Sequence, residues 1–350
     1  MNEKNKRDIR ELSLDDIQKA IESINEKSFR AQQIHDWLWL KQCRSIDEMT
    51  NLSKDLRAFL KETFEFKSIQ TDHIQVSTDG TMKFRFKTFD NHFIEGVLIP
   101  TTDRLTACIS SQIGCSLTCK FCATGKMERE RNLSFAEIFD QVAIINKKTM
   151  DEYGRRLTNI VYMGMGEPLL NYKNVMKSIE LITSPKALGM SPTRITVSTA
   201  GIAKQIKQLA DENAKFNLAL SLHAADNQTR SKIMPINDSN KIEELMEALD
   251  YYYKKTKLPV TYEYILFEDI NDSEEDAQNL IKLCRRVPSK VNIIEYNPVA
   301  GTGFEKPTDK RFDSFIEILE QSRINVRVRR SRGKDIDAAC GQLANKGEKN

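Results

Sequence analysis

Residues 108–125 read Cys-Ile-Ser-Ser-Gln-Ile-Gly-Cys-Ser-Leu-Thr-Cys-Lys-Phe-Cys-Ala-Thr-Gly and contain four of the seven cysteines of the chain. Three of these, Cys115, Cys119 and Cys122, follow the spacing Cys-x3-Cys-x2-Cys. One loop therefore presents three thiolates and leaves a fourth coordination position without a local ligand. Such a loop indicates a metal centre with an open position, which is where chemistry takes place.

The spacing of the cysteines separates two kinds of metal centre. A structural zinc site needs four protein ligands, usually as two Cys-x2-Cys pairs, and this stretch holds one such pair. Cys108 can supply the fourth thiolate, so zinc stays open. A [4Fe-4S] cluster held by three cysteines leaves one iron free for a substrate or cofactor. The spacing favours the cluster.

Composition places the chain among globular proteins. Its 350 residues, of which 40% are hydrophobic, suffice for one large domain plus a smaller unit. The net charge of +3 is too small to establish a nucleic-acid partner. No apolar run reaches the roughly 18 residues of a membrane helix, and the first residues lack a signal-peptide core. We therefore expect a cytoplasmic protein with no membrane partner, whose clustered cysteines serve as ligands or catalysts.

Two small units are expected before the main domain. Residues 1–66 show helical spacing of apolar residues, with capping-box starts at Ser13 and Ser45, and predict a helical accessory domain. Whether this domain contacts RNA is open. Residues 67–103 change to a period of two and predict a β-hairpin or meander extension. Glu95 interrupts its second strand, and an exposed carboxylate is the default expectation there.

Residues 104–323 alternate strands and helices, which predicts an α/β fold with a parallel sheet. Six units, fewer than a closed eightfold barrel, predict a partial (β/α)6 barrel, followed by a basic strand and tail at 324–350. Strands are expected at 105–110, 159–163, 194–198, 216–222, 260–267 and 291–296, with helices at 134–147, 241–253 and 273–286.

Polar residues and a glycine lie at the ends of the predicted strands, at the edge where parallel sheets bind ligands. They are Gly166, Glu167, Ser198, Ser221, His223 and Asn297. Each also has a plain structural interpretation, such as a helix cap or a core histidine. Their shared location favours a site for a polar cofactor beside the cysteine loop.

Basic residues cluster near the C-terminus. Residues 323–334 read Arg-Ile-Asn-Val-Arg-Val-Arg-Arg-Ser-Arg-Gly-Lys, which places Arg327 and Arg329 on one face of a strand. An edge strand protected by charge and an RNA contact both fit this pattern. Four further basic residues near the cysteine loop can extend an RNA contact: Lys120, Lys126, Arg129 and Arg131.

Taken together, these motifs resemble the RlmN/Cfr family of radical S-adenosylmethionine (radical SAM) methyltransferases, which modify adenosine in RNA. The resemblance covers nearly the whole chain. Its most specific part is Asp-Ile-Asp-Ala-Ala-Cys-Gly at 335–341. The other matching segments are 29–34, 108–122, 164–169, 197–201, 221–223, 296–298 and 332–343.

The resemblance implies a role for each candidate residue. Cys115, Cys119 and Cys122 would hold one [4Fe-4S] cluster. Cys340 would carry a methyl group, Cys108 would act as the second catalytic thiol, and Glu95 would accept a proton. The residues implied to contact S-adenosylmethionine are Gly166, Glu167, Ser198, Ser221, Leu222, His223 and Asn297.

The implied reaction is methylation of adenosine at C2 and consumes two S-adenosylmethionine molecules. The first would methylate Cys340, and the second would yield a radical that activates this methyl group for addition to C2. Cys108 would then attack the Cys340 sulfur, form a disulfide and release the RNA. The implied substrates are 23S rRNA and tRNA, and the implied electron donor is one such as flavodoxin with its reductase. A monomer is expected.

Three alternatives stay open on the sequence alone. A Cfr-type enzyme shares the two-cysteine chemistry but methylates C8 of adenosine. A zinc-dependent RNA-binding protein would need no catalysis. A radical SAM enzyme acting on a peptide or small molecule would leave the basic strand and Cys340 unexplained.

Overall fold

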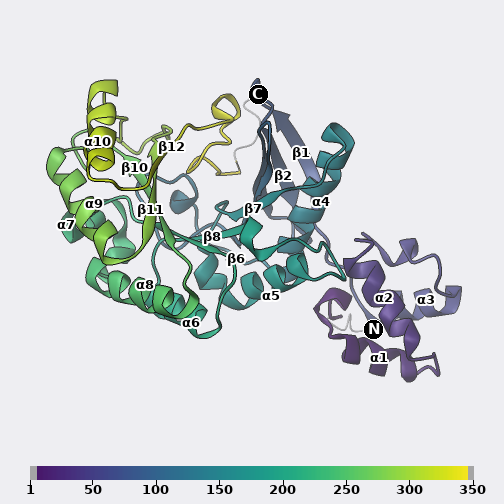
Figure 1. Ribbon diagram of the computed structural model, residues 1–350. Coiled ribbons are helices and arrows are strands. Elements are labelled where there is room, and N and C mark those ends of the chain that lie inside the picture. Colours follow the sequence, from purple (N-terminus) through teal and green to yellow (C-terminus); the bar gives the residue numbers. More distant parts are fainter. Residues whose placement is uncertain (1–5, 346–350) are drawn as a thin grey trace.

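A ten-stranded sheet forms the framework of the computed structural model, which describes residues 6–345 (Figure 1). Strands β1 to β4 pair in antiparallel fashion, and all later strands of the sheet pair in parallel. Within the described residues the sheet is open, because its order ends at β1 and at β12. In spatial order, the strands are β1 (Gln70–Val76), β2 (Met82–Lys87), β3 (Phe93–Pro100), β4 (Leu105–Cys108), β7 (Asn159–Tyr162), β8 (Ile195–Thr199), β9 (Asn217–Ser221), β10 (Val260–Leu266), β11 (Ser289–Glu295) and β12 (Val326–Arg329).

Helices between the parallel strands cover the outer side of this sheet (Figure 1). None of the helices within residues 6–345 is long and apolar enough to cross a membrane. A separate two-stranded ribbon joins β5 (Gln112–Ile113) to β6 (Arg131–Asn132). The helices are α4 (Phe135–Tyr153), α5 (Tyr172–Thr183), α6 (Ala203–Asp211), α7 (Asn227–Ile233), α8 (Ile242–Thr256), α9 (Glu274–Arg286) and α10 (Asp309–Gln321).

The predicted α/β class and partial barrel are confirmed, with two additions. All six expected parallel strands are present, and β12 adds a seventh because it pairs with β11 in parallel. The hairpin strands are continuous with the barrel, because β3 pairs with β4 from Val97–Cys108 to Pro100–Leu105. The extension is therefore one end of the same sheet.

The N-terminal helices lie to one side of the barrel (purple in Figure 1) and comprise α1 (Leu14–Glu22), α2 (Phe29–Trp39) and α3 (Lys54–Thr63). The capping box predicted at Ser13 is present, since its side chain accepts from the Asp16 N–H. The helix start predicted at Ser45 is wrong: only a 3-10 turn, Ile46–Glu48, follows it. The Glu48 carboxylate accepts from the Arg44 N–H instead, at 2.9 Å.

A buried cluster of charges joins these helices to the barrel. Asp140 of α4 forms ion pairs with Arg10, at 2.7 Å, and with Arg44, at 2.6 Å. The same carboxylate accepts a hydrogen bond from the Ile69 N–H at 3.2 Å, and Asp8 provides a second partner for Arg10. Buried pairs of this kind demand close geometry, so they fix the point of contact between the two parts.

Candidate active site

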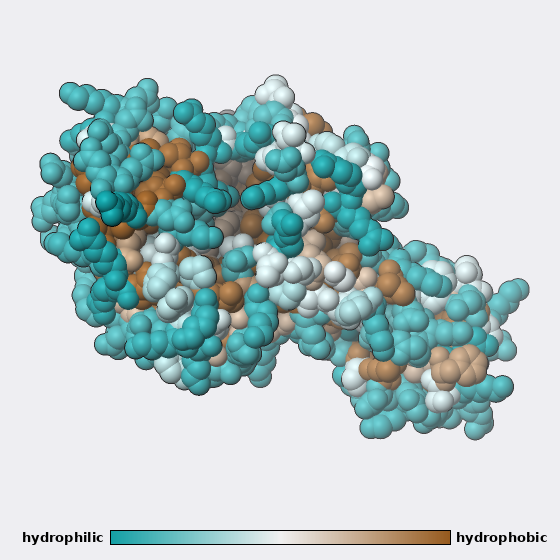
Figure 2. Space-filling model, viewed as in Figure 1, coloured by the Kyte–Doolittle hydropathy of each residue, from teal (hydrophilic) through white to brown (hydrophobic). Residues whose placement is uncertain are grey.

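A cavity of about 370 Å³ opens at the carboxyl ends of the parallel strands. Figure 2 shows the surface hollowed between the part that carries α10 and the part that carries the hairpin strands, with apolar side chains inside the hollow. Ten of the thirteen predicted site residues line this cavity: Cys108, Cys115, Cys119, Cys122, Gly166, Glu167, Ser198, Ser221, His223 and Cys340. The remaining three are Glu95, Leu222 and Asn297.

The three loop cysteines lie close enough together to influence one another. Burial raises the pKa of Cys115 to about 11 and also raises the pKa of Cys119 and Cys122, and the charges of neighbouring thiolates add to each effect. Within residues 6–345, no three His, Cys, Asp or Glu side chains are grouped around a position for one metal ion. In a [4Fe-4S] cluster each thiolate binds a different iron, so the donor set fits a cluster.

The cysteine loop is held from both sides. The Lys120 N–H donates to the Ile233 carbonyl at 2.9 Å, and the Ala123 N–H donates to the Gly341 carbonyl at 2.8 Å. Close packing also requires glycine at position 125, where a Cβ would lie 2.7 Å from the Cys119 carbonyl oxygen. The loop is thus fixed between the end of α7 and the C-terminal tail.

The Gly164–Pro168 loop approaches the cysteine loop closely, as its glycines predicted. Gly166 has a φ of +93°, and a Cβ there would lie 2.4 Å from the Cβ of Gln112. Glu167 is buried, and burial raises its pKa. Its carboxylate accepts from the Ala200 N–H at 2.7 Å and from the Leu169 N–H at 3.0 Å. The remaining lone pairs can accept hydrogen bonds from an ammonium group.

Two serines and a histidine form a polar wall on neighbouring strands. The Ser198 and Ser221 hydroxyl oxygens are 3.2 Å apart. His223 is buried, and burial lowers its pKa to about 3, with the charge of Arg230 adding to the effect. Its Nδ1 accepts from the Ile265 N–H at 3.1 Å. The imidazole is therefore neutral at pH 7 with its proton on Nε2, where it is a hydrogen-bond donor.

Two of the residues expected to contact a cofactor lie just outside the cavity lining. Leu222 is fully buried, and its backbone N–H and carbonyl bond to Glu263 and Arg230. Asn297 is also buried, and its Oδ1 has no hydrogen-bond partner among the described residues. Its Nδ2 donates to the Cys340 carbonyl at 3.4 Å. An unpartnered buried oxygen at this place fits a missing polar ligand.

Cys108 and Cys340 meet in the cavity although they lie far apart in the sequence. Burial raises the pKa of Cys108 to about 12, and the Cys340 charge adds to this effect. Cys340 is exposed to the cavity, yet the protein atoms around it also raise its pKa. Arg329 opposes both increases. All seven cysteines are free thiols, so the disulfide expected during the reaction is not formed in this structure.

Hydrogen bonds before and after Cys340 hold the tail over the cavity. The Asp335 carboxylate accepts from the Ser77 hydroxyl at 2.5 Å and from the Thr78 N–H at 3.1 Å. Beyond Cys340, Glu95 accepts from the Ala344 N–H at 2.9 Å. The expectation of an exposed Glu95 is wrong, since this carboxylate is 2% exposed beneath the tail.

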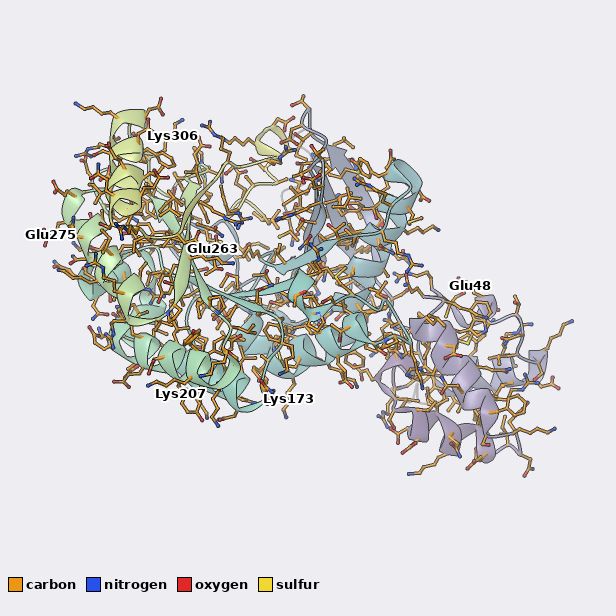
Figure 3. The ribbon with its side chains drawn as sticks, in the orientation of Figure 1. Glu48, Lys173, Lys207, Glu263, Glu275 and Lys306 are labelled. Carbon is orange, nitrogen blue, oxygen red and sulfur yellow. The ribbon has the colours of Figure 1, made fainter. Side chains whose placement is uncertain are left out.

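Glu263 and Arg329 line the cavity, although the sequence patterns did not predict either residue as part of the site. Arg329 Nη1 lies 3.2 Å from a Glu263 oxygen, and both side chains line the cavity. Figure 3 shows Glu263 among the strands, whereas Lys207 and Glu275 lie on the outer helices. The expected basic row is therefore divided, because Arg327 is exposed while Arg329 turns inward to its partner. A carboxylate within an apolar strand was the available signal for Glu263.

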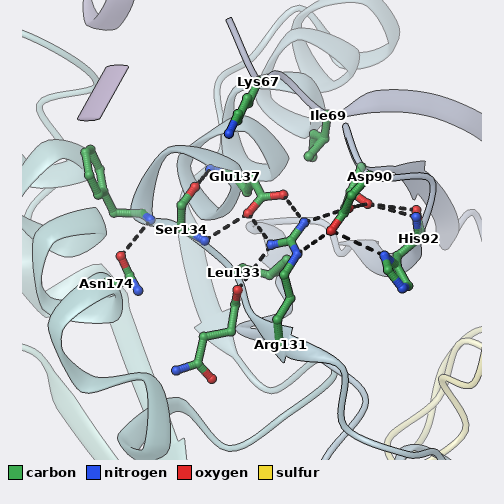
Figure 4. A network of polar contacts seen from close by, with 12 residues as sticks. Lys67, Ile69, Asp90, His92, Arg131, Leu133, Ser134, Glu137 and Asn174 are labelled. Atoms are coloured by element: carbon green, nitrogen blue, oxygen red, sulfur yellow. Dashed lines mark hydrogen bonds and ion pairs between the residues drawn. The ribbon is translucent and has the colours of Figure 1, made fainter. Parts of the chain in front are cut away.

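Some of the basic residues beside the cysteine loop bond to other residues of the chain, so they are less available for RNA than expected. Arg131 forms paired hydrogen bonds with Asp90, at 2.6 and 2.8 Å, and with Glu137, at 2.8 and 2.9 Å (Figure 4). Lys126 donates to the Ala300 carbonyl at 2.8 Å. Lys120, Lys126 and Arg129 are exposed and form no ion pair among the described residues, although Arg129 donates to Asn132 Oδ1 at 3.1 Å. The expected contact surface is smaller than the sequence indicated.

Comparison with known proteins first defines the class. Residues 109–281 match the radical SAM superfamily. The crystal structure of a radical SAM methyltransferase from Sphaerobacter thermophilus has 38% sequence identity and a TM-score of 0.90, covering 96% of this chain and 99% of that one. The fold and the cavity thus define a radical SAM protein, a superfamily that uses a [4Fe-4S] cluster and S-adenosylmethionine.

Full-length relatives then define the family. Residues 7–66 match the ribosomal RNA large subunit methyltransferase N-terminal domain. A probable dual-specificity RNA methyltransferase RlmN from Christiangramia forsetii is 53% identical, over 97% of each chain. The corresponding protein from Cytophaga hutchinsonii is 51% identical, over 97% of this chain and 93% of its own. The chain belongs to the RlmN family of radical SAM methyltransferases.

Proposed function

We propose that this chain methylates C2 of adenosine in RNA, acting on 23S rRNA and on tRNA. The observation that carries the proposal is the common cavity, in which Cys108 and Cys340 face the three-cysteine loop. The dual-specificity RNA methyltransferases named among the relatives support both substrates. Neither zinc binding nor C8 methylation accounts for this similarity as well.

The cavity residues would hold the two cofactors. Cys115, Cys119 and Cys122 would ligate a [4Fe-4S] cluster. Bound there, the cluster and S-adenosylmethionine supply a methyl group and a carbon-centred radical. The residues that would position S-adenosylmethionine are Gly166, Glu167, Ser198, Ser221, Leu222, His223 and Asn297. His223 Nε2 and the two serine hydroxyls would donate hydrogen bonds, and Glu167 and Asn297 Oδ1 would accept them.

Cys340 and Cys108 would have different catalytic roles in the transfer of the methyl group. The Cys340 thiolate would accept the methyl group, which would then lose a hydrogen atom to the carbon-centred radical. Its carbon would bond to C2 of adenosine, after which one electron would return to the cluster and the C2 proton would leave. Cys108 attacks the Cys340 sulfur as a thiolate, so that a sulfur–sulfur bond forms while the sulfur–carbon bond breaks. The released electron pair takes a proton at the methyl carbon. A dithiol or another two-electron reductant must then reduce the disulfide before the next turnover.

Glu95 would accept the proton that leaves C2. Its support is its place beneath the segment that follows Cys340. In the present arrangement both carboxylate oxygens are engaged, one with the tail and the other 3.7 Å from Lys83 Nζ. The proton-accepting role therefore requires the tail to leave Glu95 when RNA enters.

We also propose that the chain consists of four functional segments. Residues 1–66 would form an accessory domain, 67–103 a β extension, 104–323 the catalytic barrel and 324–350 the tail. Residues 1–5 and 346–350 of these ranges lie outside the described structure. The protein would act as a cytoplasmic monomer away from membranes and receive electrons from a donor such as flavodoxin with its reductase.

The decisive experiment is anaerobic reconstitution with iron, sulfide, S-adenosylmethionine, reductant and unmodified RNA. Digestion and mass spectrometry of the nucleosides then separate 2-methyladenosine from 8-methyladenosine. We expect 2-methyladenosine from both 23S rRNA and tRNA. A product methylated at C8 would replace the proposal with the Cfr-type activity, and protein that stays colourless and iron-free would overturn the radical chemistry.

A further inference from the structure

Arg230 is a buried arginine near the cysteine loop that has no carboxylate partner within residues 6–345. It lies in α7 and is 0% exposed. The guanidinium donates to the Leu222 and Ser221 carbonyls, at 3.1 and 3.3 Å, to the Ala200 carbonyl, and to Asn237 Oδ1 at 3.1 Å. Burying a charge without a counter-charge is costly. Carbonyl oxygens satisfy its hydrogen bonds but leave the positive charge uncompensated.

The position of this charge is fixed relative to the cysteines. The end of α7 is tied to the loop, because the Ile233 carbonyl accepts from the Lys120 N–H at 2.9 Å. Cys119 and Cys122 pack against the same apolar cluster as Ile233. Burial lowers the pKa of Arg230 to about 10, and the neighbouring Cys119 opposes this decrease. The tie between α7 and the loop therefore holds the guanidinium charge close to the cysteines.

We propose that Arg230 tunes the reduction potential of the cluster by placing one buried positive charge in the helix whose end bonds to the cysteine loop. This inference rests on the proposed function, in which the loop holds a [4Fe-4S] cluster. One-electron reduction by an external donor adds one negative charge to the cluster and its thiolates and makes or breaks no bond in the protein. A fixed cation nearby favours the reduced state, because net charge is among the factors that set cluster potentials.

The test compares two substitutions of Arg230 in the reconstituted full chain. Potentiometric titration with dithionite and mediators, followed by electron paramagnetic resonance, needs neither S-adenosylmethionine nor RNA. We expect Arg230→Gln to lower the ratio of reduced to oxidised cluster at a fixed potential by about tenfold, which is a shift of about 59 mV for a one-electron couple. Arg230→Lys keeps the charge, so its potential should stay near that of the unaltered chain.

A second variant leaves Arg230 in place. Asn237→Asp sets a carboxylate against the guanidinium and compensates its charge, so we expect a shift in the same direction. The substitution also removes the amide N–H groups that donate to the Asn227 carbonyl and to the Ser231 hydroxyl, which lowers stability but adds no charge elsewhere. The matched control is Lys232→Gln, which removes an exposed charge from the same helix. Solvent screens that charge, so the potential should not move.

The outcomes separate this inference from the proposed function. An unchanged potential in Arg230→Gln and Asn237→Asp, with the iron content of the unaltered chain, would show that Arg230 only ties the strand ends together. If Arg230→Gln does not retain the cluster, the reduction potential of Asn237→Asp tests the inference in its place. Failure of the unaltered chain to take up iron would overturn the proposed function and this inference with it.

Discussion

Glu95 Oε2 accepts a hydrogen bond from the Ala344 N–H at 2.9 Å, just beyond the cysteine that would carry the methyl group. The Asn345 N–H donates to the same oxygen at 3.2 Å. A carboxylate of an inner strand thus holds the C-terminal tail from below, while Asp335 holds it before Cys340. The placement of Cys340 and the availability of Glu95 are therefore coupled.

Glu95→Gln should loosen the tail. The change removes the charge from two hydrogen bonds and leaves the buried Lys83 without its partner, so we expect a loss of about 1.5–3 kcal/mol in local stability. Hydrogen exchange measured by mass spectrometry should show faster exchange at residues 341–345. The control is Glu62→Gln, which alters an exposed carboxylate on α3. Exchange as slow as in the unaltered chain would contradict the anchoring role.

Cys108→Ala should trap RNA on the protein. The substitution removes the thiol that would attack the Cys340 sulfur, so a covalent RNA–protein adduct should accumulate after a single addition. Denaturing gel electrophoresis and mass spectrometry of the RNA-linked peptide measure this product. Cys284→Ala is the matched control, because Cys284 does not line the cavity and should leave turnover unchanged. Normal turnover by Cys108→Ala would remove its resolving role.

His223 should make the protein without cofactors less stable in mild acid. Its pKa is about 3 when folded, below the ordinary value of 6.5, because burial disfavours the charged imidazole. The contribution of the neutral imidazole to the free energy of unfolding is complete above pH 6.5. It is lost as the pH falls towards 3, since only the unfolded chain binds the proton in this range. Between pH 6.5 and 5, this loss should be about 1.5 kcal/mol, and His223→Asn should lack it.

Asparagine suits position 223 because His223 has a φ of +54°, which asparagine tolerates better than most residues. Urea unfolding at several pH values measures the difference between the two proteins. Identical pH dependence in both would show that His223 does not remain neutral in the folded chain.

Asp140→Asn should weaken the junction between the helical unit and the barrel. The change leaves Arg10 and Arg44 with less compensating charge, and breaking a buried ion pair typically costs about 3–5 kcal/mol. Urea unfolding measures the loss. Asp250→Asn disrupts the exposed pair with Lys254 and should cost less than about 1 kcal/mol. Equal effects of the two substitutions would contradict a structural role for the buried cluster.

Arg330→Ala should reduce the salt dependence of RNA binding. Arg330 is exposed at the rim of the cavity, where a phosphate contact would release a counterion. The slope of log affinity against log salt should fall by about 0.7–0.9. Arg285→Ala, at the exposed end of α9, should leave the slope unchanged. A slope that Arg330→Ala does not alter would exclude this phosphate contact.

Local patterns in the sequence predicted much of the fold and part of the site. Strand and helix periods identified the partial barrel, because these features depend on neighbouring residues. For the same reason, the cysteine spacing predicted a metal loop, which stays a prediction. The same reasoning failed at Ser45, where the Glu48 side chain bonds to a different backbone group. It also failed at Arg131, whose partners Asp90 and Glu137 come from other segments.

The sequence by itself determined that three cysteines share one loop and that polar residues gather at one edge of a parallel sheet. Only the tertiary structure decided that Cys340 returns to Cys108, that Glu95 lies beneath the tail and that Arg230 is buried in a helix tied to the cysteine loop. The physical reason is that contacts between distant segments arise from packing and hydrogen bonding across the fold. They leave no period or spacing in the chain from which they can be read.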